Sequence, residues 1–279
     1  MNFDASRRAR RAYASGRLTR MCAAAIAAAV CVSAAVLIFP AGAAQRELPS
    51  NTLWEVVQNL CVPGQSDFHD PQPCLEVNLD GGIEKGFAIL RDPRGGTQFL
   101  LIPTVRISGI ESPTLRDAHA VNYFADAWEA RAHVSEALHQ PLPRDGIGLA
   151  INSAVGRSQD QMHIHISCVL PGVLDALHKS ERKVGEEWAL LDAPLAGRRY
   201  IAMWAPGEDL SAVNVFRLLA EKVPEAARDM GNRTLVVVGF TRRDGTRGFV
   251  LLSDQANKII GDQALGEELL DRDCRIAAK

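Results

Sequence analysis

Aromatic side chains and net charge are both scarce in this 279-residue sequence. Aromatic residues make up 6% of it, charged residues 23% and hydrophobic residues 47%, and the formal net charge is -2. This composition is typical of a globular protein and excludes a disordered, collagenous or multi-span membrane chain. The charge is uneven, since residues 1–20 hold six arginines against Asp4 (+5) and the rest of the chain carries -7. An acidic main body argues against a nucleic-acid binder, which would present a basic face.

Charge is absent altogether between Met21 and Gln45, a run of mostly small apolar residues. About 20 apolar residues cross a bilayer as a helix, and the arginines before the run orient that end to the cytoplasm. We therefore expect residues 1–45 to form a basic cytoplasmic tail and a single membrane anchor. The small residues 41–43 resemble a cleavage site, so a removed signal peptide is the alternative. In both cases residues 46–279 are expected to form an extracytoplasmic domain.

Cys-x-x-Cys pairs are also absent, which argues against a structural zinc site. Cys22 and Cys31 lie in the uncharged run, and the remaining cysteines are Cys61, Cys74, Cys168 and Cys274. Four cysteines allow three pairings, and an oxidising compartment lets disulfides form. We favour a Cys61–Cys74 bond around a short polar loop and a Cys168–Cys274 bond that ties the chain end to the core. Buried free thiols are the alternative.

Strand-like apolar runs and amphipathic helical segments follow one another after residue 50. Strands are expected at 86–90, 98–107, 146–152, 161–170, 198–204, 234–240 and 248–254, helices at 51–61, 120–139, 171–182 and 211–223, and a loop at 62–82. Because the strands come in runs without regular βαβ alternation, the sequence predicts an α+β fold with an antiparallel sheet and flanking helices. The hairpin at 234–254 echoes the one at 86–107, which suggests a degenerate internal repeat.

The most informative stretch of the sequence is the strand-like run that contains two histidines. Side chains alternate along a strand, so one face is expected to carry Gln159, Gln161, His163, His165 and Ser167. Two histidines on one polar face of an apolar strand are poorly explained by packing. Three interpretations compete: a solvated face, a His-x-His metal site without an obvious third ligand, and attack on phosphorus by a neutral imidazole.

The ordered set of residues around these histidines resembles the histidine triad superfamily, whose His-x-His-x-His motif follows an asparagine and a glutamine. Asn152, Gln159, His163 and His165 stand at the spacing of that asparagine, that glutamine and the first two histidines, and Ser167 replaces the third histidine. A rival register takes Gln161, His163 and His165 as the three motif positions, which makes His163 the middle one. In LLIPTVRISGI, a segment similar to the superfamily's Pro-x-x-His-Ile element, Arg106 stands where the histidine would be.

Within the superfamily the sequence looks like the CDP-diacylglycerol pyrophosphatase family, a family of membrane-associated bacterial hydrolases. The resemblance covers most of residues 50–275 and is carried by FLLIPTVRISGIESP, NYFADAW, INSAVGRSQDQMHIHISC and the terminal Asp273-Cys274. It implies a histidine-triad-like fold and a phosphoric anhydride hydrolase that converts CDP-diacylglycerol to CMP and phosphatidate through a nucleotidyl-histidine. It also implies the bacterial inner membrane as the location, with the catalytic domain in the periplasm.

The resemblance further implies roles for individual residues. His165 would be the nucleophile on the α-phosphorus of the CMP moiety, and His163 would orient or polarise the site. Gln159 and Ser167 would donate hydrogen bonds to phosphate oxygens, where charge builds up in the transition state. Asn152 would position the phosphate or the backbone.

Arg106 is a substrate-binding candidate on physical grounds, because a guanidinium binds phosphate oxygens in a fork. A surface salt bridge is the alternative, and Gln161 and Asp160 are secondary candidates. Since an imidazole supplies the nucleophile, we expect no metal and no cofactor, and a liponucleotide as the substrate. A periplasmic hydrolase of soluble nucleotide diphosphate esters is the second hypothesis. A non-enzymatic module that binds a nucleotide or a metal is the third.

Overall fold

The computed structural model describes residues 50–278, and these residues belong to one compact unit. The tail and anchor expected at residues 1–45, with Cys22 and Cys31, lie outside the described residues. Within residues 50–278, none of the helices combines the length and the apolar character needed to cross a membrane.

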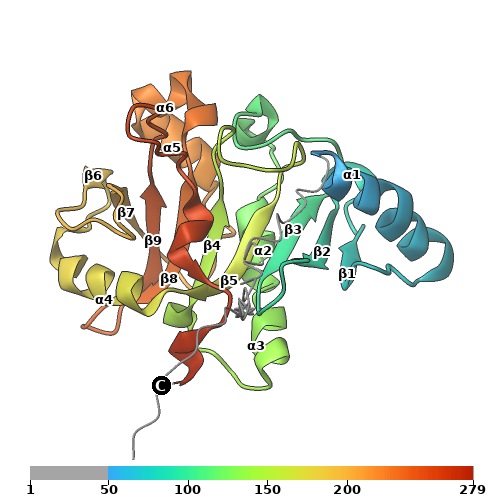
Figure 1. Cartoon of the computed structure of the whole chain (residues 1–279), viewed down its shortest axis with the longest axis horizontal. Helices are drawn as coiled ribbons and strands as arrows, with labels where there is room; N and C mark the ends of the chain where they lie inside the picture. The colour runs from blue at the N-terminus through green and yellow to red at the C-terminus, as the bar shows by residue number, and fades with distance from the viewer. Residues whose placement is uncertain (1–49, 279) are drawn as a thin grey trace, which may run out of the picture. The chain divides into compact units, whose positions relative to one another are not determined.

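One antiparallel sheet runs through the described chain, in the order β1-β2-β3-β5-β4-β8-β9-β7-β6 (Figure 1). Its strands are β1 (Glu76–Asn78), β2 (Phe87–Arg91), β3 (Phe99–Pro103), β4 (Ile147–Ile151), β5 (Ile164–Val169), β6 (Ala189–Leu190), β7 (Ile201–Pro206), β8 (Leu235–Thr241) and β9 (Arg247–Ser253). The short β10 (Leu270–Asp271) pairs with the end of β5. The predicted α+β class with an antiparallel sheet is therefore confirmed.

The strand order contains the same arrangement twice. The order β2-β3-β5-β4 recurs as β6-β7-β9-β8, and the two arrangements meet where β4 pairs with β8. Each half is a hairpin, two α-helices and a second hairpin. In this topology the β8–β9 hairpin is the counterpart of the β4–β5 hairpin. The sequence pattern instead matched β8–β9 to the hairpin at 86–107, because these two hairpins have apolar runs of similar length.

The helices are α1 (Thr52–Val56), α2 (Tyr123–Glu129), α3 (Ala132–Leu138), α4 (Pro171–Ser180), α5 (Val215–Lys222) and α6 (Pro224–Arg228). The π-helical turn η1 (Val57–Cys61) continues α1. The helix expected at 120–139 is interrupted between α2 and α3, and the one expected from 211 begins at Val215, where the Asn214 side chain accepts a hydrogen bond from the Arg217 N–H. Residues 62–82, expected as loop, include the turn η2 (Gly64–Phe68) and β1.

Apolar side chains fill both faces of the sheet. On one face, α2, α3 and α5 pack on the inward side chains of β3, β5, β4, β8 and β9, including Ile164 and Ile166. On the other face there are two separate clusters: α4, the segment 184–200 and η8 (Gly266–Leu269) cover β8 and β9, and α1 with η1 covers β2 and β3. Figure 1 shows α4 and α1 at opposite ends of the sheet. Strand β5, which bears His165, lies between these two clusters.

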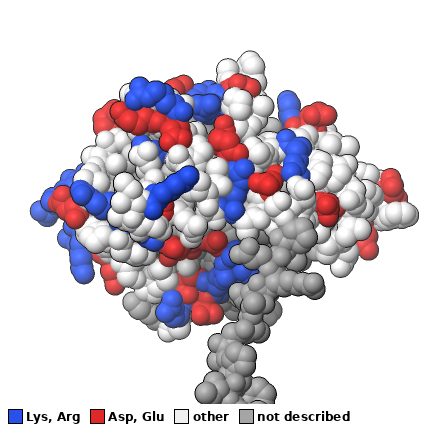
Figure 2. All heavy atoms as spheres, turned by 45° about the horizontal axis from the view of Figure 1, so that its top comes forward, with Lys and Arg blue, Asp and Glu red and all other residues white. Residues whose placement is uncertain are grey.

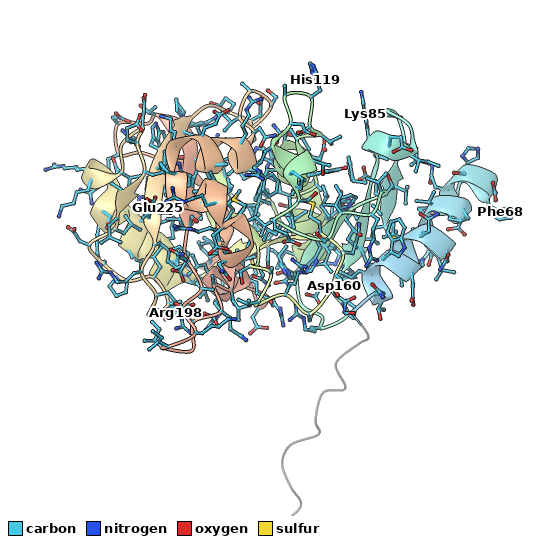
Figure 3. All side chains as sticks on the ribbon, turned by 90° about the horizontal axis from the view of Figure 1, so that it is seen from above. Phe68, Lys85, His119, Asp160, Arg198 and Glu225 are labelled. Atoms are coloured by element: carbon cyan, nitrogen blue, oxygen red, sulfur yellow. A yellow bond between two sulfur atoms is a disulfide. The ribbon has the colours of Figure 1, made fainter. Side chains whose placement is uncertain are left out.

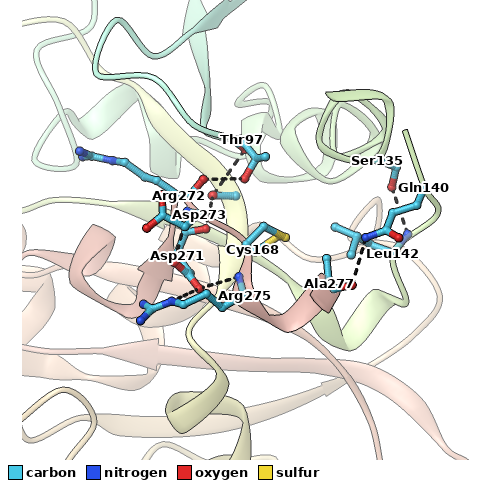
Figure 4. Close-up of a disulfide and its surroundings, with 12 residues drawn as sticks. Thr97, Ser135, Gln140, Leu142, Cys168, Asp271, Arg272, Asp273, Arg275 and Ala277 are labelled. Carbon is cyan, nitrogen blue, oxygen red and sulfur yellow. Dashed lines mark hydrogen bonds and ion pairs between the residues drawn. A yellow bond between two sulfur atoms is a disulfide. The ribbon is translucent and has the colours of Figure 1, made fainter. Parts of the chain in front are cut away.

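Two disulfides are present, Cys61–Cys74 and Cys168–Cys274, which is the pairing favoured from the sequence. The second joins β5 to the C-terminal segment, where the Asp271 carboxylate accepts hydrogen bonds from Arg275 and the Arg272 carbonyl accepts one from Thr97 (Figure 4). On the face seen in Figure 2, Lys and Arg are interleaved with Asp and Glu.

Candidate active site

The alternation of side chains along β5 brings the two histidines together. Ile164, Ile166 and Cys168 point into the core, so His163 and His165 share the opposite face. Their ring centroids lie 4.9 Å apart, with the ring planes at 72°. His163 is 7% exposed and His165 is 1% exposed. The strand itself begins at Ile164, so the predicted continuous face from Gln159 to Ser167 exists only for its second half.

His165 accepts a hydrogen bond at Nδ1 from a glutamine that precedes β3. The Gln98 Nε2 atom lies 2.9 Å from His165 Nδ1 and also donates to Asp92 Oδ2 (2.5 Å), while Gln98 Oε1 accepts from Arg272 Nε. This network fixes Gln98 with its amide nitrogen toward the histidine. The neutral His165 ring therefore carries its proton on Nε2. That Nε2 atom is buried and has no hydrogen-bond partner among the described residues.

His163 has the opposite arrangement. Its Nδ1 lies 2.8 Å from the backbone carbonyl oxygen of Gln161, which can only accept a hydrogen bond. The Nδ1–H therefore donates to this carbonyl, and in the neutral ring Nε2 keeps its lone pair. The two neighbouring histidines thus present complementary groups, a lone pair on His163 and an N–H donor on His165.

Burial keeps both rings neutral. It lowers the pKa of His163 below its ordinary value, against the opposing effect of the hydrogen bond to Gln161. Burial also lowers the pKa of His165 to about 4, although the nearby Glu267 carboxylate favours the charged form. Both imidazole rings are therefore uncharged at neutral pH, with one N–H each.

Glu267 is the centre of a polar network beside the histidines. Its carboxylate accepts hydrogen bonds from Asn152 (3.1 Å), Arg94 (2.9 Å) and Arg272 (2.8 Å), and one oxygen lies 3.8 Å from His165 Nδ1. Burial alone would raise the pKa of Glu267, but His165 and the two guanidinium groups hold it down at about 2. Glu267 is therefore ionised and fixed in place.

Several residues expected to bind substrate are hydrogen-bonded within the protein's own chain. Asn152 bonds Glu267 through both ends of its amide. Gln159 Oε1 accepts a hydrogen bond from the Leu53 N–H at the start of α1. Ser167 is fully buried beneath β10, where its hydroxyl donates to the Asp271 carbonyl.

The side chains of Gln161 and Arg106 also bond to groups other than the two imidazoles. The Gln161 side chain forms hydrogen bonds with the backbone of Pro103, Val105 and Ile107. These bonds hold the segment before β5 against the loop after β3. Arg106 is exposed; it donates to Asn51 Oδ1 and lies over the Trp54 ring. It lines a cavity together with Lys85 and His119 that includes neither site histidine.

The sequence analysis missed the residues that surround His165: Asp92, Arg94, Gln98, Glu267 and Arg272. The first three come from the β2–β3 turn and the other two from the C-terminal segment. A hydrogen bond from the Thr97 N–H to the Arg272 carbonyl (2.8 Å) holds these two segments together. A charged hairpin turn and a charged chain end are typical of solvated surface, so their pattern carried no signal.

Within residues 50–278, no group of three or more His, Cys, Asp and Glu side chains is arranged to hold a metal ion. The chemistry that the described side chains offer is nucleophilic. A neutral imidazole with a free lone pair stands next to a buried N–H donor, and Arg94 and Arg272 (side chains 42% and 34% exposed) supply positive charge beside them. Such a set suits attack on an anionic phosphorus centre.

Comparison with known proteins agrees with this chemistry. The model of the family described as CDP-diacylglycerol pyrophosphatase matches residues 48–278. A curated CDP-diacylglycerol pyrophosphatase from Yersinia pestis is 41% identical over 227 residues, which cover 81% of this chain and 85% of that protein.

Proposed function

The chain belongs to the CDP-diacylglycerol pyrophosphatase family, and from that premise we propose that it hydrolyses CDP-diacylglycerol to CMP and phosphatidate at the His163–His165 pair. The observation that carries the proposal is the pair of complementary neutral imidazoles 4.9 Å apart. We also propose that the fold is histidine-triad-like. The repeated hairpin–helix–hairpin topology supports this, with the histidines on one inner strand of the first half.

In the first chemical step, a histidine nitrogen attacks the α-phosphorus of the CMP moiety. A phosphorus–nitrogen bond forms, the bond from the α-phosphorus to the bridging oxygen breaks, and phosphatidate leaves with that oxygen and the electron pair. In the second step water attacks the same phosphorus and gives up a proton to the solvent, the phosphorus–nitrogen bond breaks, and CMP is released as the histidine returns to its neutral form.

We assign the attack to His163 rather than to His165, the residue that the sequence resemblance favoured. A nucleophile needs a lone pair on the attacking atom, and the hydrogen bond from His163 to the Gln161 carbonyl leaves one on Nε2. The bond from Gln98 leaves a proton on His165 Nε2 instead. This assignment corresponds to the rival motif register, with Gln161, His163 and His165 as the three positions.

His165 then acts as a hydrogen-bond donor. An unpartnered buried N–H costs about 1–3 kcal/mol, and a phosphoryl oxygen of the substrate would satisfy it. Arg94 is already paired with Asp92 and Glu267, and Arg272 with Glu267 and Gln98. The N–H groups of each guanidinium beyond those bonds would donate to the pyrophosphate oxygens.

The two histidines are distinguished by trapping the covalent intermediate. We expect His163→Ala to lower CMP release at least about a thousandfold and to give no nucleotidyl adduct after acid quench and mass spectrometry. His165→Ala should lower the rate about a hundredfold, by loss of one transition-state donor, yet still form the adduct. His119→Ala, at an exposed histidine in the loop before α2 (Figure 3), is the matched control and should behave as wild type. An adduct in His163→Ala would overturn the assignment.

The substrate is tested by incubating the detergent-solubilised full chain with CDP-diacylglycerol and with CDP-choline in parallel, with a chelator present. Rapid CMP release from the lipid, insensitive to the chelator, is the expected result. Release from CDP-choline alone would assign the site to soluble nucleotide diphosphate esters. Release from neither would leave a binding module.

We further propose that the chain is a single-pass protein of the bacterial inner membrane with the domain in the periplasm. The uncharged run from Met21 to Gln45 and the arginines before it support this location. Two disulfides in the domain support an oxidising compartment.

A further inference from the structure

A narrow hairpin after β9 ends in two exposed isoleucines. The backbones of Asn257 and Asp262 exchange hydrogen bonds of 2.8 and 2.9 Å, and Gly261 takes the positive φ (70°) of the turn. Ile259 at the tip is 95% exposed and Ile260 is 67% exposed. Large apolar side chains presented together in this way on a projecting turn mark an interaction site.

A second loop brings another apolar side chain to the base of this hairpin. The Ser153 N–H donates to the Ala264 carbonyl (3.2 Å) and the Ser153 hydroxyl to the Gln263 carbonyl (2.5 Å), so residues 153–157 lie against residues 263–264. Val155, in this loop, is 38% exposed. We name the set Val155, Ile259 and Ile260 the apolar rim.

The chain enters the domain on the same side. The Asp160 N–H donates to the Ser50 carbonyl (2.6 Å), so the described chain begins beside the loop that carries Val155. Arg198 pairs with Asp262 at the base of the hairpin (3.4 Å). Figure 3 shows Asp160 and Arg198 along one edge of the domain and Lys85 and His119 along the opposite edge. The uncharged run of residues 21–45 precedes Ser50 in the sequence.

The rim is also connected to the site. The chain from the hairpin passes through Ala264, fixed by Ser153, into η8, which carries Glu267. The hairpin is therefore joined by a short stretch of chain, held at Ala264, to the turn that carries the carboxylate beside His165.

We propose that the apolar rim contacts the lipid surface and turns the His163 site toward the bilayer, an inference that rests on the lipid substrate of the proposed function. A second protein is a poor fit, because specific protein interfaces bury about 800 Å² on each partner and a hairpin tip is far smaller. Shallow insertion suits two isoleucines, and the stem of the neighbouring Lys258 can reach back to the headgroups.

The first test compares two forms of substrate with the full chain reconstituted in phosphatidylcholine vesicles. Ile259→Asp combined with Ile260→Asp should lower kcat/KM for vesicle-embedded CDP-diacylglycerol roughly fivefold to tenfold. It should leave hydrolysis of a water-soluble short-chain analogue unchanged. Ile83→Asp, at a half-exposed isoleucine beside Lys85 on the opposite edge, is the matched control and should alter neither rate. Equal rates for the double variant and wild type on vesicles would overturn the proposal.

The second test does not depend on activity. The fluorescence of Ile259→Trp should be quenched by vesicles with brominated acyl chains, beyond the quenching seen for the parent chain, whereas that of Ile83→Trp should not. Absence of this extra quenching would overturn the lipid contact. Quenching by a chain that hydrolyses neither form of CDP-diacylglycerol would uphold the contact and refute the proposed function, so the two failures are distinguishable.

Discussion

At the scale of single residues, the two histidines differ only through their hydrogen-bond partners. A backbone carbonyl fixes the proton of His163 on Nδ1, and an amide nitrogen fixes the proton of His165 on Nε2. Glu267 stands behind both, held by Asn152 and two arginines. It lies 3.8 Å from His165, the ring that we propose as the donor, so we treat it as a positioning residue.

We expect Glu267→Gln to lower kcat about tenfold to a hundredfold by releasing Arg94, Arg272 and His165 from their fixed positions. The pH profile gives a separate readout. Protonation removes the nucleophilic lone pair, so the wild-type rate should fall only as the pH drops through the lowered pKa of His163, below 6.5. The carboxylate favours the protonated histidines, so its removal should move this acid limb to lower pH.

Glu268→Gln is the control for this prediction, because Glu268 is adjacent in sequence but its carboxylate lies 3.9 Å from Arg198 Nε instead of beside His165. Its rate and pH profile should match wild type. An acid limb at the same pH in Glu267→Gln and wild type would contradict electrostatic coupling between the carboxylate and the imidazoles.

At the scale of elements, η8 determines where Glu267 lies. The turn approaches β8 so closely that a Cβ atom on Gly266 would collide with the Thr234 hydroxyl and stand 2.8 Å from Val236 Cγ2. Thr234 cannot easily turn away, since its hydroxyl donates to the Ile151 carbonyl (2.5 Å). A glycine is therefore required at this contact.

Gly266→Ala should lower the free energy of unfolding by about 1–3 kcal/mol, the usual cost of overpacking, and reduce kcat because η8 is displaced. Denaturant unfolding and steady-state kinetics measure the two effects. Gly172→Ala in α4 is the matched control: nothing lies within 4 Å of the added Cβ, so stability should be unchanged or slightly higher. Equal stability of the two variants would show that η8 can move away without cost.

At the scale of the whole molecule, the two halves of the sheet have different uses. Strand β9 is the counterpart of β5, and on the face where β5 carries His165 and Ser167 it carries Val250 and Leu252. These side chains pack beneath α4 and the segment 184–200. The second half therefore buries this face under apolar side chains, and the proposed site lies on the first half together with Glu267 and Arg272 of the C-terminal segment.

The disulfides provide a test of both stability and location. Replacing Cys168 and Cys274 together by serine should lower the Tm more than the same change at Cys61 and Cys74. The paired cysteines are 106 residues apart in the first disulfide and 13 residues apart in the second. A disulfide that closes a 100-residue loop stabilises the folded state by about 4.7 kcal/mol, and one that closes a 15-residue loop by about 3 kcal/mol. A larger loss from the short loop would contradict this ordering.

Thiol labelling of the wild-type chain taken directly from cells and denatured without a reductant reports on the compartment in which the domain folded. If the domain lies in the periplasm, Cys61, Cys74, Cys168 and Cys274 should resist labelling until a reductant is added. Ready labelling of all four would overturn the proposed location.

The sequence by itself determined the local features of this protein. Alternation along residues 162–168 placed His163 and His165 on one face and the isoleucines in the core, and strands in runs indicated an antiparallel α+β fold. These features depend on neighbours in the chain, which a periodic pattern encodes.

Only the tertiary structure decided what surrounds the histidines. Gln98 reaches His165 across 67 residues of sequence because β3 pairs with β5, and β10 brings Arg272 to the same place. Gln161 faces the loop after β3 rather than the site because its side chain binds that backbone. Hydrogen-bond partners set the protonation of each ring, and strand pairing between distant segments chooses those partners. A local periodic pattern of residues does not show which distant segments pair.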